Sequence, residues 1–415
     1  MPQAPQDSGV PERKLLLKLM QQGLAAVNGR NCVHAALRSR SLPDKLYLAA
    51  IGKAADAMTA GAIDALGSRV RAGLVVTRYG YLDSPVYRDP RLLSLEAGHP
   101  IPDEQSLAAG RALCLFLERV PEHAHFVFLI SGGASSLVEV LPDHVTLEQL
   151  QALNRWLLGS GLPIDAINRV RCTLSQIKGG RLIEHLAGRD ADVLLMSDVP
   201  GDDPAHIGSG LLVAPDLGPL PALPPEFAEL VKREVQPGNS GPNGDVEVSV
   251  VASNQQMLEA IRVGAANEGV PITVHAALPA DDALECGGRV AEAVCSASPG
   301  LYVWGGETTV TLPAEPGRGG RNQALALAAA RQLAGHPNCC ILAVGTDGSD
   351  GNTEDAGALV DGDTLARGTD AGFDAEDCLR RADSGSFLEA SGDLIHTGPT
   401  GTNVMDLIIA YKHDD

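Results

Sequence analysis

A glycine–lysine pair stands between an apolar run and a helical pattern. The run LYLAAI is followed by Gly52 and Lys53, and the sequence AADAMTAGAIDAL comes next. An ammonium group beside the positive end of a helix is repelled unless an anion binds there. The pair therefore indicates a site for a phosphate or a carboxylate, although a solvated lysine in a first helical turn would look the same.

Acidic residues follow another apolar run. Asp198 comes directly after residues 192–197, at the expected carboxyl end of a strand, where ligands of α/β sheets gather. A carboxylate there can bind Mg²⁺ or accept the proton of a hydroxyl group. Asp202 and Asp203 follow, and we expect them to cap the next turn.

The segment SGGASS (131–136) offers backbone N–H groups with little side-chain obstruction. Such a loop suits phosphate oxygens, although a Gly-rich strand-to-helix turn can equally be only a tight turn. The candidate ligand groups are Ser131, Gly132, Gly133, Ser135 and Ser136. The chain contains neither a Walker A sequence nor GxGxxG, so this loop is not a P-loop or an ordinary dinucleotide fingerprint.

A Gly-rich stretch in the second half of the chain contains two arginines just before a predicted helix. Glu307 lies at an expected strand end, and Arg318 and Arg321 precede a helix whose first turn contains Asn322 and Gln323. A planar guanidinium can bind two phosphate oxygens at once. Phosphoryl transfer depends mostly on positioning and charge neutralisation, which such groups provide.

Further polar loops accompany these motifs. GTDGSDG (345–351) follows an apolar strand, and its spacing excludes a calcium loop of the EF-hand type. HTGPTGTN (396–403) is either a turn or a wall of a binding cleft. The candidate binding residues of these loops, with the first residue of a predicted helix, are Thr346, Asp347, Asp350, Thr400 and Asn254.

A basic stripe is predicted in INRVRCTLSQIKGGRL (167–182). Arg171 and Lys178 are two turns apart on one face if this segment is a helix, with Arg181 nearby. The stripe could contact a substrate, and the glycines at 179–180 that end the helix support this interpretation. A solvated helix face is the alternative.

The elements that position these residues follow a βα rhythm. Short apolar runs at 46–52, 72–77, 125–131 and 192–197 alternate with helical patterns, which predicts a doubly wound parallel sheet. The rhythm breaks in a Pro/Gly-rich stretch (214–245) and restarts at 246–253. We therefore predict an α/β protein with a larger Rossmann-like domain at 1–236 and a smaller α/β domain at 245–415. The last strand, near the C-terminus, could pair in either domain.

Composition sets further limits. Hydrophobic residues make up 44%, charged residues 20%, and mean hydropathy is +0.02, as in a globular protein. The net charge of -20 disfavours nucleic acids and anionic membranes as partners. The eight cysteines have no zinc-ligand spacing, and the N-terminus lacks the pattern of a secretory signal, so a cytoplasmic location is expected.

In this order, the motifs resemble those of one known family. GKAA, SGGASS, SQIKGGRL, SDVPGDD, GGETTV, GRGGRNQ, GTDGSDG and TGPTGTN are similar to those of the class II glycerate 2-kinases, whose C-terminal half is called the MOFRL domain. The resemblance covers residues 10–412. Members are often labelled hydroxypyruvate reductases.

The resemblance implies transfer of the γ-phosphoryl group of ATP to D-glycerate, with Mg²⁺, to give 2-phosphoglycerate. The essential Lys, Asp and Arg of the family fall on Lys53, Asp198 and Arg321, with Asp198 and Asp347 as candidate metal ligands. Lys53 and Asp198 precede the predicted boundary and Arg321 follows it. We therefore expect the reaction to require closure of a cleft between the domains.

The sequence departs from the family pattern at three places. Cys172-Thr173 stand where a basic residue is usual, Gly210-Leu211-Leu212 replace a GPT-like turn, and His396 replaces a lysine. The change at Gly210 alters one wall of the expected cleft. The change at His396 would weaken a peripheral anion contact or make it pH-dependent.

Two other functions stay open at this point. One is an NAD(P)H-dependent hydroxypyruvate or tartronate semialdehyde reductase, and the other is a sugar-acid sensor without catalysis. The sequence leaves open the phosphorylated position, the stereochemistry and the oligomeric state, for which a homodimer is one candidate.

Overall fold

A computed structural model describes residues 11–162, 164–215, 218–232 and 244–414 of the chain. It divides into two compact units, which we describe separately. The parallel-sheet unit runs from Gly29 to Ser253. The mixed-sheet unit combines the chain up to Asn28 with the chain from Asn254 onward.

The parallel-sheet unit contains a six-stranded sheet in the order β3-β2-β1-β4-β5-β6, in which all five pairings are parallel. Its strands are β1 (Leu46–Ile51), β2 (Val70–Arg78), β3 (Leu92–Ala97), β4 (His125–Ile130), β5 (Ala191–Met196) and β6 (Val246–Ala252). The strand order reverses between β1 and β4, and this is where ligands of doubly wound sheets bind. The predicted Rossmann-like fold is thereby confirmed.

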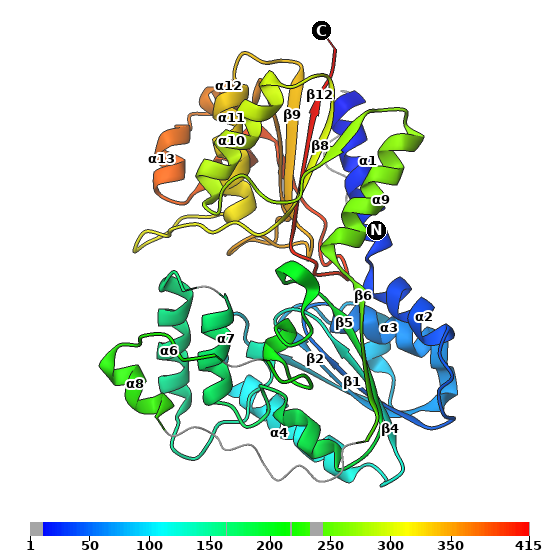
Figure 1. The fold of residues 1–415 in the computed structure, drawn as a ribbon. Coiled ribbons are helices and arrows are strands. Elements are labelled where there is room, and N and C mark those ends of the chain that lie inside the picture. Colours follow the sequence, from blue (N-terminus) through cyan, green and yellow to red (C-terminus); the bar gives the residue numbers. More distant parts are fainter. Residues whose placement is uncertain (1–10, 163, 216–217, 233–243, 415) are drawn as a thin grey trace. The chain divides into compact units, whose positions relative to one another are not determined.

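Helices cover both faces of this sheet (Figure 1). Figure 1 shows α2 (Gly29–Arg38) and α3 (Ala55–Leu66) on one face and α4 (Glu104–Arg119) on the other. Capping boxes begin two of the helices, at Asp103 for α4 and at Thr146 for α6. The remaining helices are α5 (Ala134–Leu137), α6 (Leu147–Gly159), α7 (Ile164–Thr173) and α8 (Pro225–Val231), with short 3₁₀ turns at Gly67–Arg69, Pro85–Arg88, Arg181–Leu186, Pro200–Asp202 and Ile207–Ser209.

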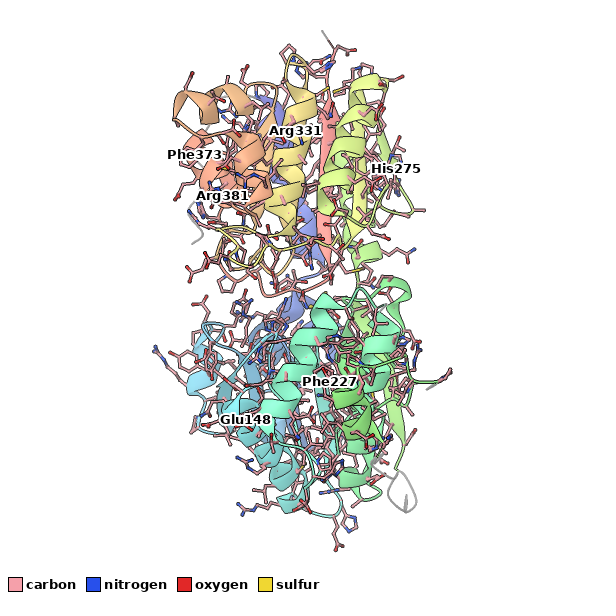
Figure 2. The ribbon with its side chains drawn as sticks, turned by 90° about the vertical axis from the view of Figure 1, so that its left-hand side faces the viewer. Glu148, Phe227, His275, Arg331, Phe373 and Arg381 are labelled. Atoms are coloured by element: carbon pink, nitrogen blue, oxygen red, sulfur yellow. The ribbon has the colours of Figure 1, made fainter. Side chains whose placement is uncertain are left out.

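A second apolar cluster of this unit joins α6, α7 and α8. Val145, Leu153, Leu157, Val170 and Leu174 form its buried centre. The ring of Phe227 on α8, labelled in Figure 2, lies 5.8 Å from the ring of Trp156 on α6, measured between centroids. Trp156 therefore reports on the packing of the parallel-sheet unit.

The mixed-sheet unit contains a six-stranded sheet in the order β11-β10-β9-β12-β8-β7. Only β7 and β8 are paired in parallel, and the other pairings are antiparallel. Its strands are β7 (Ile272–Val274), β8 (Gly300–Gly306), β9 (Cys339–Gly345), β10 (Gly357–Asp361), β11 (Leu394–Ile395) and β12 (Asp406–Lys412). The last strand, β12, thus lies in the centre of the mixed sheet.

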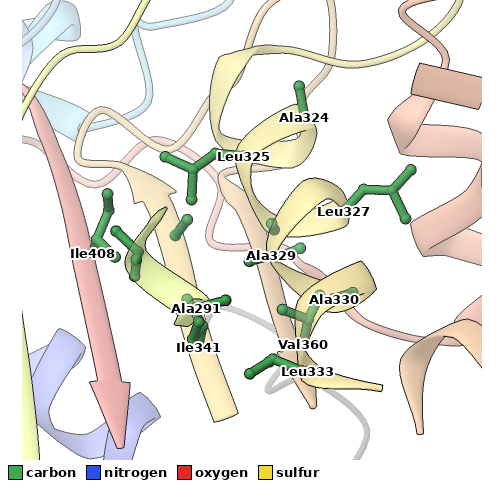
Figure 3. Close-up of a cluster of buried hydrophobic side chains, with 14 of the residues drawn as sticks. Ala291, Ala324, Leu325, Leu327, Ala329, Ala330, Leu333, Ile341, Val360 and Ile408 are labelled. Carbon is green, nitrogen blue, oxygen red and sulfur yellow. The ribbon is translucent and has the colours of Figure 1, made fainter. Parts of the chain in front are cut away.

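Helices pack on both faces of the mixed sheet as well (Figure 1). One face carries α1 (Pro11–Ala26) and α9 (Asn254–Asn267). The other carries α10 (Ala283–Ser296), α11 (Arg321–Leu333), α12 (Thr364–Asp370), α13 (Ala375–Arg380) and α14 (Ser384–Ser391). Figure 3 shows the core on this side, where Leu325 and Leu333 of α11 lie near Ile341 of β9 and Ile408 of β12.

This division differs from the predicted domains at 1–236 and 245–415, and two elements account for the difference. β6 extends the parallel sheet, with Ala191 opposite Val246 and Met196 opposite Ala252, so it belongs to the unit that precedes it. The helix α1 buries Leu16, Leu19 and Met20 in the mixed-sheet unit, on α9. Most of the predicted boundary, at 233–243, lies outside the described residues.

The position of α1 generates a prediction about stability. Leu19 is fully buried, and a Cβ atom on Gly264 of α9 would lie 3.1 Å from its Cδ2. We expect Leu19→Ala to lower the unfolding free energy of the mixed-sheet unit by about 2–5 kcal/mol. The chain has two tryptophans, Trp156 in one unit and Trp304 in the other, so fluorescence can follow each unit separately.

In a Trp156→Phe background, Leu19→Ala should shift the urea transition seen by Trp304. In a Trp304→Phe background it should leave the transition seen by Trp156 in place. The control Lys18→Ala removes an exposed ion pair with Glu268 and should cost less than about 1 kcal/mol. A shift only in the Trp156 signal would show that α1 stabilises the other unit.

Candidate active site

Lys53 and the loop 131–136 are joined at the carboxyl ends of two neighbouring strands, β1 and β4. The N–H of Lys53 donates to the carbonyl of Gly132 at 3.0 Å, and the N–H of Ala54 donates to Ser131 Oγ at 3.0 Å. Gly52 has φ +133°, and a Cβ atom there would lie 2.1 Å from Ser131 Oγ. Only glycine fits at this position, which brings the two loops into contact.

The side chain of Lys53 lies over the Gly-rich loop. A Cβ atom on Gly133 would lie 3.3 Å from Lys53 Cγ and 2.8 Å from His99 Cδ2. Among the described residues, the N–H groups of Gly132 and Gly133 have no hydrogen-bond acceptor. A cation and two backbone donors therefore gather at the point where the strand order reverses, as an anion site requires. The sequence analysis did not identify His99, which has no motif of its own.

The serines of this loop mainly hold it in shape. Ser136 Oγ donates to the carbonyl of Gly133 at 3.1 Å. Ser135 Oγ lies 2.8 Å from Ser209 Oγ, which also contacts Asn168 Oδ1 at 3.0 Å. These contacts connect the loop to α7 and to residues 207–209.

Asp198 lies two residues beyond β5 and is partly buried, at the same edge of the sheet as Lys53 and Gly132. Of the two acidic residues predicted to cap the next turn, Asp203 does so. Its Oδ1 accepts the N–H of Ala205 at 2.9 Å, and its carboxylate pairs with His206 at 3.2 Å. No capping contact is seen for Asp202 among the described residues, and its φ is +55°.

The prediction of a basic stripe on one helix face is wrong. The helix α7 ends at Thr173, so Arg171 and Lys178 do not share a helix. Lys178 is 2% exposed and forms an ion pair with Glu139, itself 1% exposed. Ser175 Oγ also donates to Glu139, at 2.5 Å. The chain turns inward after α7 because this buried carboxylate accepts both groups.

Arg171 and Arg181 differ in what they bind. Nη1 of Arg181 donates to the carbonyls of Cys172, Ser175 and Lys178, and so holds the segment after α7. Nε of Arg171 donates to Asn154 at 3.0 Å, and within the described ranges its other nitrogens have no hydrogen-bond partner. Burial lowers the pKa of the Arg171 guanidinium, and the charge of Glu139 opposes this shift. Arg171 is therefore the member of the predicted stripe with donors left for an anion.

The buried Lys178–Glu139 ion pair leads to a prediction about stability. Lys178→Met would leave a buried carboxylate without its cation, which commonly costs about 3–5 kcal/mol. We expect this loss in the urea transition followed by Trp156, and we expect Glu139→Gln in the same chain to recover at least half of it. An unchanged transition in Lys178→Met would contradict the assignment.

In the mixed-sheet unit, Arg321 is the first residue of α11 and is bound by two carboxylates. Its Nε donates to Asp406 Oδ2 at 2.6 Å, and its Nη2 donates to Asp406 Oδ1 at 2.9 Å and to Glu307 Oε1 at 2.7 Å. Burial lowers the pKa of Arg321, but Asp406 and Glu307 outweigh it and raise this pKa well above its ordinary value. Arg321 is thus a fixed, permanent cation. Sequence analysis missed Asp406, although it is the first residue of an apolar strand, β12.

Asp350 caps the start of α11. Its carboxylate accepts the N–H of Asn322 at 3.1 Å and the N–H of Gln323 at 2.8 Å, and Asn322 Nδ2 lies 3.3 Å away. A Cβ atom on Gly320 would lie 2.4 Å from Asp350, so glycine is needed there. Burial raises the pKa of Asp350 to about 7, the nearby carboxylate of Asp406 adds to this, and the N–H bonds oppose it. Asp350 and Asn322 therefore shape the helix start.

The raised pKa of Asp350 predicts a pH dependence. The folded protein binds this proton more tightly than the unfolded chain, so the contribution to stability is lost as pH rises from the ordinary value of 3.8 to about 7. Asp350→Asn removes the titration. The stability of the wild type relative to this variant should fall by roughly 2–4 kcal/mol between about pH 4 and pH 8.

Urea unfolding of the Trp156→Phe protein, with and without Asp350→Asn, measures this difference at each pH. A difference that does not change with pH would show that Asp350 is ionised throughout the range.

The remaining predicted residues of this unit mostly connect loops. Thr346 Oγ1 contacts the carbonyl of Met405 at 2.6 Å, and Thr400 Oγ1 donates to the carbonyl of Thr346. Asn254 Nδ2 donates to the carbonyls of Val404 and Asp406, at 2.8 and 3.1 Å. Asp347 Oδ1 accepts the N–H of Ser349 at 3.0 Å and contacts its Oγ at 3.1 Å. Loops 345–351 and 396–405 are therefore one connected body with β12.

His396, which replaces a lysine of the family pattern, belongs to a separate acidic contact. Its Nδ1 lies 2.6 Å from Asp355 Oδ1, and Arg318 Nη2 donates to Asp355 Oδ2 at 2.8 Å. Arg318 also pairs with Glu389. Arg318 is therefore bound by two carboxylates, those of Asp355 and of Glu389 on α14.

Within 11–162, 164–215, 218–232 and 244–414, no three His, Cys, Asp or Glu side chains gather to hold a metal ion. No helix in these ranges is both long and apolar enough to cross a membrane.

Comparisons with known proteins identify the class. A family described as a domain of unknown function (DUF4147) matches residues 15–219, and the MOFRL family matches residues 300–406. A crystal structure of glycerate kinase from Thermotoga maritima has a TM-score of 0.80 at 33% identity, covering 96% of this chain and 99% of that chain. The protein is therefore a two-domain α/β protein of the glycerate kinase type.

Sequence relatives narrow the assignment. A D-glycerate 2-kinase of Thermotoga maritima is 36% identical over 96% of this chain and 97% of that protein. A protein of Agrobacterium vitis named putative hydroxypyruvate reductase is 37% identical over 96% of this chain and 94% of that protein. The chain belongs to the glycerate 2-kinase family with a MOFRL domain, which confirms the family predicted from the motifs.

Proposed function

We propose that the protein phosphorylates D-glycerate at its 2-hydroxyl with ATP and releases 2-phosphoglycerate and ADP. The observation that carries this proposal is the anion site at Lys53, where the N–H groups of Gly132 and Gly133 lack acceptors among the described residues. The similarity to a D-glycerate 2-kinase over 96% of the chain supports the choice of substrate.

The proposed roles follow from the contacts. Lys53 and Arg321 neutralise charge that develops on the transferred phosphoryl group, a function for fixed cations. Asp198 orients the 2-hydroxyl or binds the metal. Arg171, whose Nη groups lack hydrogen-bond acceptors in the described ranges, binds the glycerate carboxylate. Lys178 is excluded from that role because Glu139 already pairs with it.

Magnesium fits the residues present, although a dedicated three-ligand cluster does not occur among the described residues. Mg²⁺ is usually held by one or two carboxylates together with nucleotide phosphates and water. Asp198 is the ligand we propose, and Asp347, which follows β9, is the second candidate. When bound, the ion would neutralise phosphate charge. A cytoplasmic location and a homodimer stay predictions.

Single substitutions test the three proposed catalytic residues. Lys53→Met, Asp198→Asn and Arg321→Ala should each lower kcat for glycerate-dependent ADP release by about 10²-fold or more, because each removes a positioned charge. Matched controls are the exposed residues Lys45, Asp44 and Arg380, whose alanine variants should keep wild-type activity. Near-wild-type activity in all three test variants would overturn the site.

The reductase alternative is tested with the same protein. We expect no oxidation of NADH or NADPH in the presence of hydroxypyruvate, at protein concentrations where ADP release from ATP and glycerate is rapid. Cofactor oxidation without ADP release would favour the reductase.

A further inference from the structure

Asp406 holds the guanidinium of Arg321 on two of its three nitrogens. The contacts are Nε to Oδ2 at 2.6 Å and Nη2 to Oδ1 at 2.9 Å, the side-by-side geometry of a bidentate arginine–carboxylate pair. The Asp406 side chain is 6% exposed and that of Arg321 is 33% exposed. One partner is therefore buried, and the other reaches the surface of the unit.

The backbone of Asp406 is fixed on several sides. It is the first residue of β12, which lies between β8 and β9, and it is opposite Gly306 on one side and Gly345 on the other. Asn254 Nδ2 donates to its carbonyl at 3.1 Å. The carboxylate of Asp406 therefore stands on a central strand of the mixed sheet, paired on both sides.

The start of α11 is restrained independently. The carboxylate of Asp350 binds the two N–H groups that follow Arg321. The backbone of Arg321 is thus held by Asp350, and the Nε–Nη2 edge of its guanidinium is held by Asp406. Because the three nitrogens of this planar group point in trigonal directions, Nη1 points away from Asp406. Among the described residues, Nη1 has no hydrogen-bond partner.

Glu307 makes a different kind of contact with Arg321 than Asp406 does. Of the Arg321 nitrogens, it contacts Nη2, at 2.7 Å, and its side chain is 42% exposed. One hydrogen bond at an exposed site orients a guanidinium less strongly than two parallel bonds to a buried carboxylate. Asp406 is therefore the group that sets the orientation of Arg321.

We propose that Asp406 is a positioning residue, which acts on phosphoryl transfer only by aiming Arg321 Nη1 at an oxygen of the transferred group. The proposal rests on the proposed function, in which Arg321 neutralises phosphoryl charge. An arginine fixed before the reaction loses no rotamer freedom in the transition state. Loss of this positioning should therefore lower kcat.

The test is a double-mutant cycle on the full-length protein. Asp406→Asn keeps the shape and one acceptor oxygen, and it should lower kcat for glycerate-dependent ADP release by about 10–100-fold. KM for glycerate should stay within about two-fold, since a contact made only in the transition state affects kcat. In an Arg321→Ala background, Asp406→Asn should cause no further loss, because it acts through Arg321.

A chemical rescue separates positioning from structural support. Guanidinium ion at millimolar concentration, added to Arg321→Ala, should restore part of kcat when Asp406 is present and restore none of it with Asp406→Asn. The matched control is Asp393→Asn, another buried aspartate of the same unit, which binds Arg367 and Arg13. It should lower the urea midpoint seen by Trp304 and leave kcat unchanged.

The outcomes are distinct. If Asp406→Asn fails to fold, Asp406→Glu takes its place in the cycle and in the rescue. Wild-type kcat in these variants, or an equal loss with and without Arg321, overturns the positioning role while the kinase proposal stands. A wild-type protein without glycerate-dependent ADP release overturns both.

Discussion

The carboxylate of Asp350 is the contact on which the mixed-sheet site depends. The first turn of a helix leaves N–H groups without partners, and Asp350 binds those of Asn322 and Gln323. This contact fixes the backbone that carries Arg321. Once the helix start is fixed, Asp406 and Glu307 can hold the arginine side chain. The position of Arg321 is thus set by the three carboxylates that bind its backbone neighbours and its side chain, and not by the Gly-rich loop that precedes it.

The parallel-sheet unit reaches a similar result by another route. Here the neighbouring strands β1 and β4 end at the same edge of the sheet. The N–H groups of Lys53 and Ala54 donate hydrogen bonds to the loop 131–136, and these bonds hold the two loops together. Lys53 then lies over backbone donors that have no acceptor in the described structure. Each unit therefore offers a positioned cation with further donors, and each does so on its own.

The sequence predicted those features that depend on neighbours along the chain. Lys53 and Asp198 follow apolar runs, so their places at strand ends could be derived from the run and the rule for parallel sheets. The pairing of Arg321 with Asp406 spans 85 positions, and that of Lys178 with Glu139 spans 39. Such contacts have no local signal. For the same reason the sequence assigned β6 and α1 to the wrong unit, because the elements they pack against are distant in the sequence.

Phosphorus NMR of the product shows directly whether the protein phosphorylates glycerate at its 2-hydroxyl. The protein is incubated with ATP, Mg²⁺ and D-glycerate, and proton coupling to the product phosphorus is recorded. Phosphorylation at the 2-hydroxyl places the phosphorus next to one carbon-bound proton, so we expect a doublet from 2-phosphoglycerate. A triplet, from phosphate on the terminal CH₂ group, or the absence of any glycerate phosphate would contradict it.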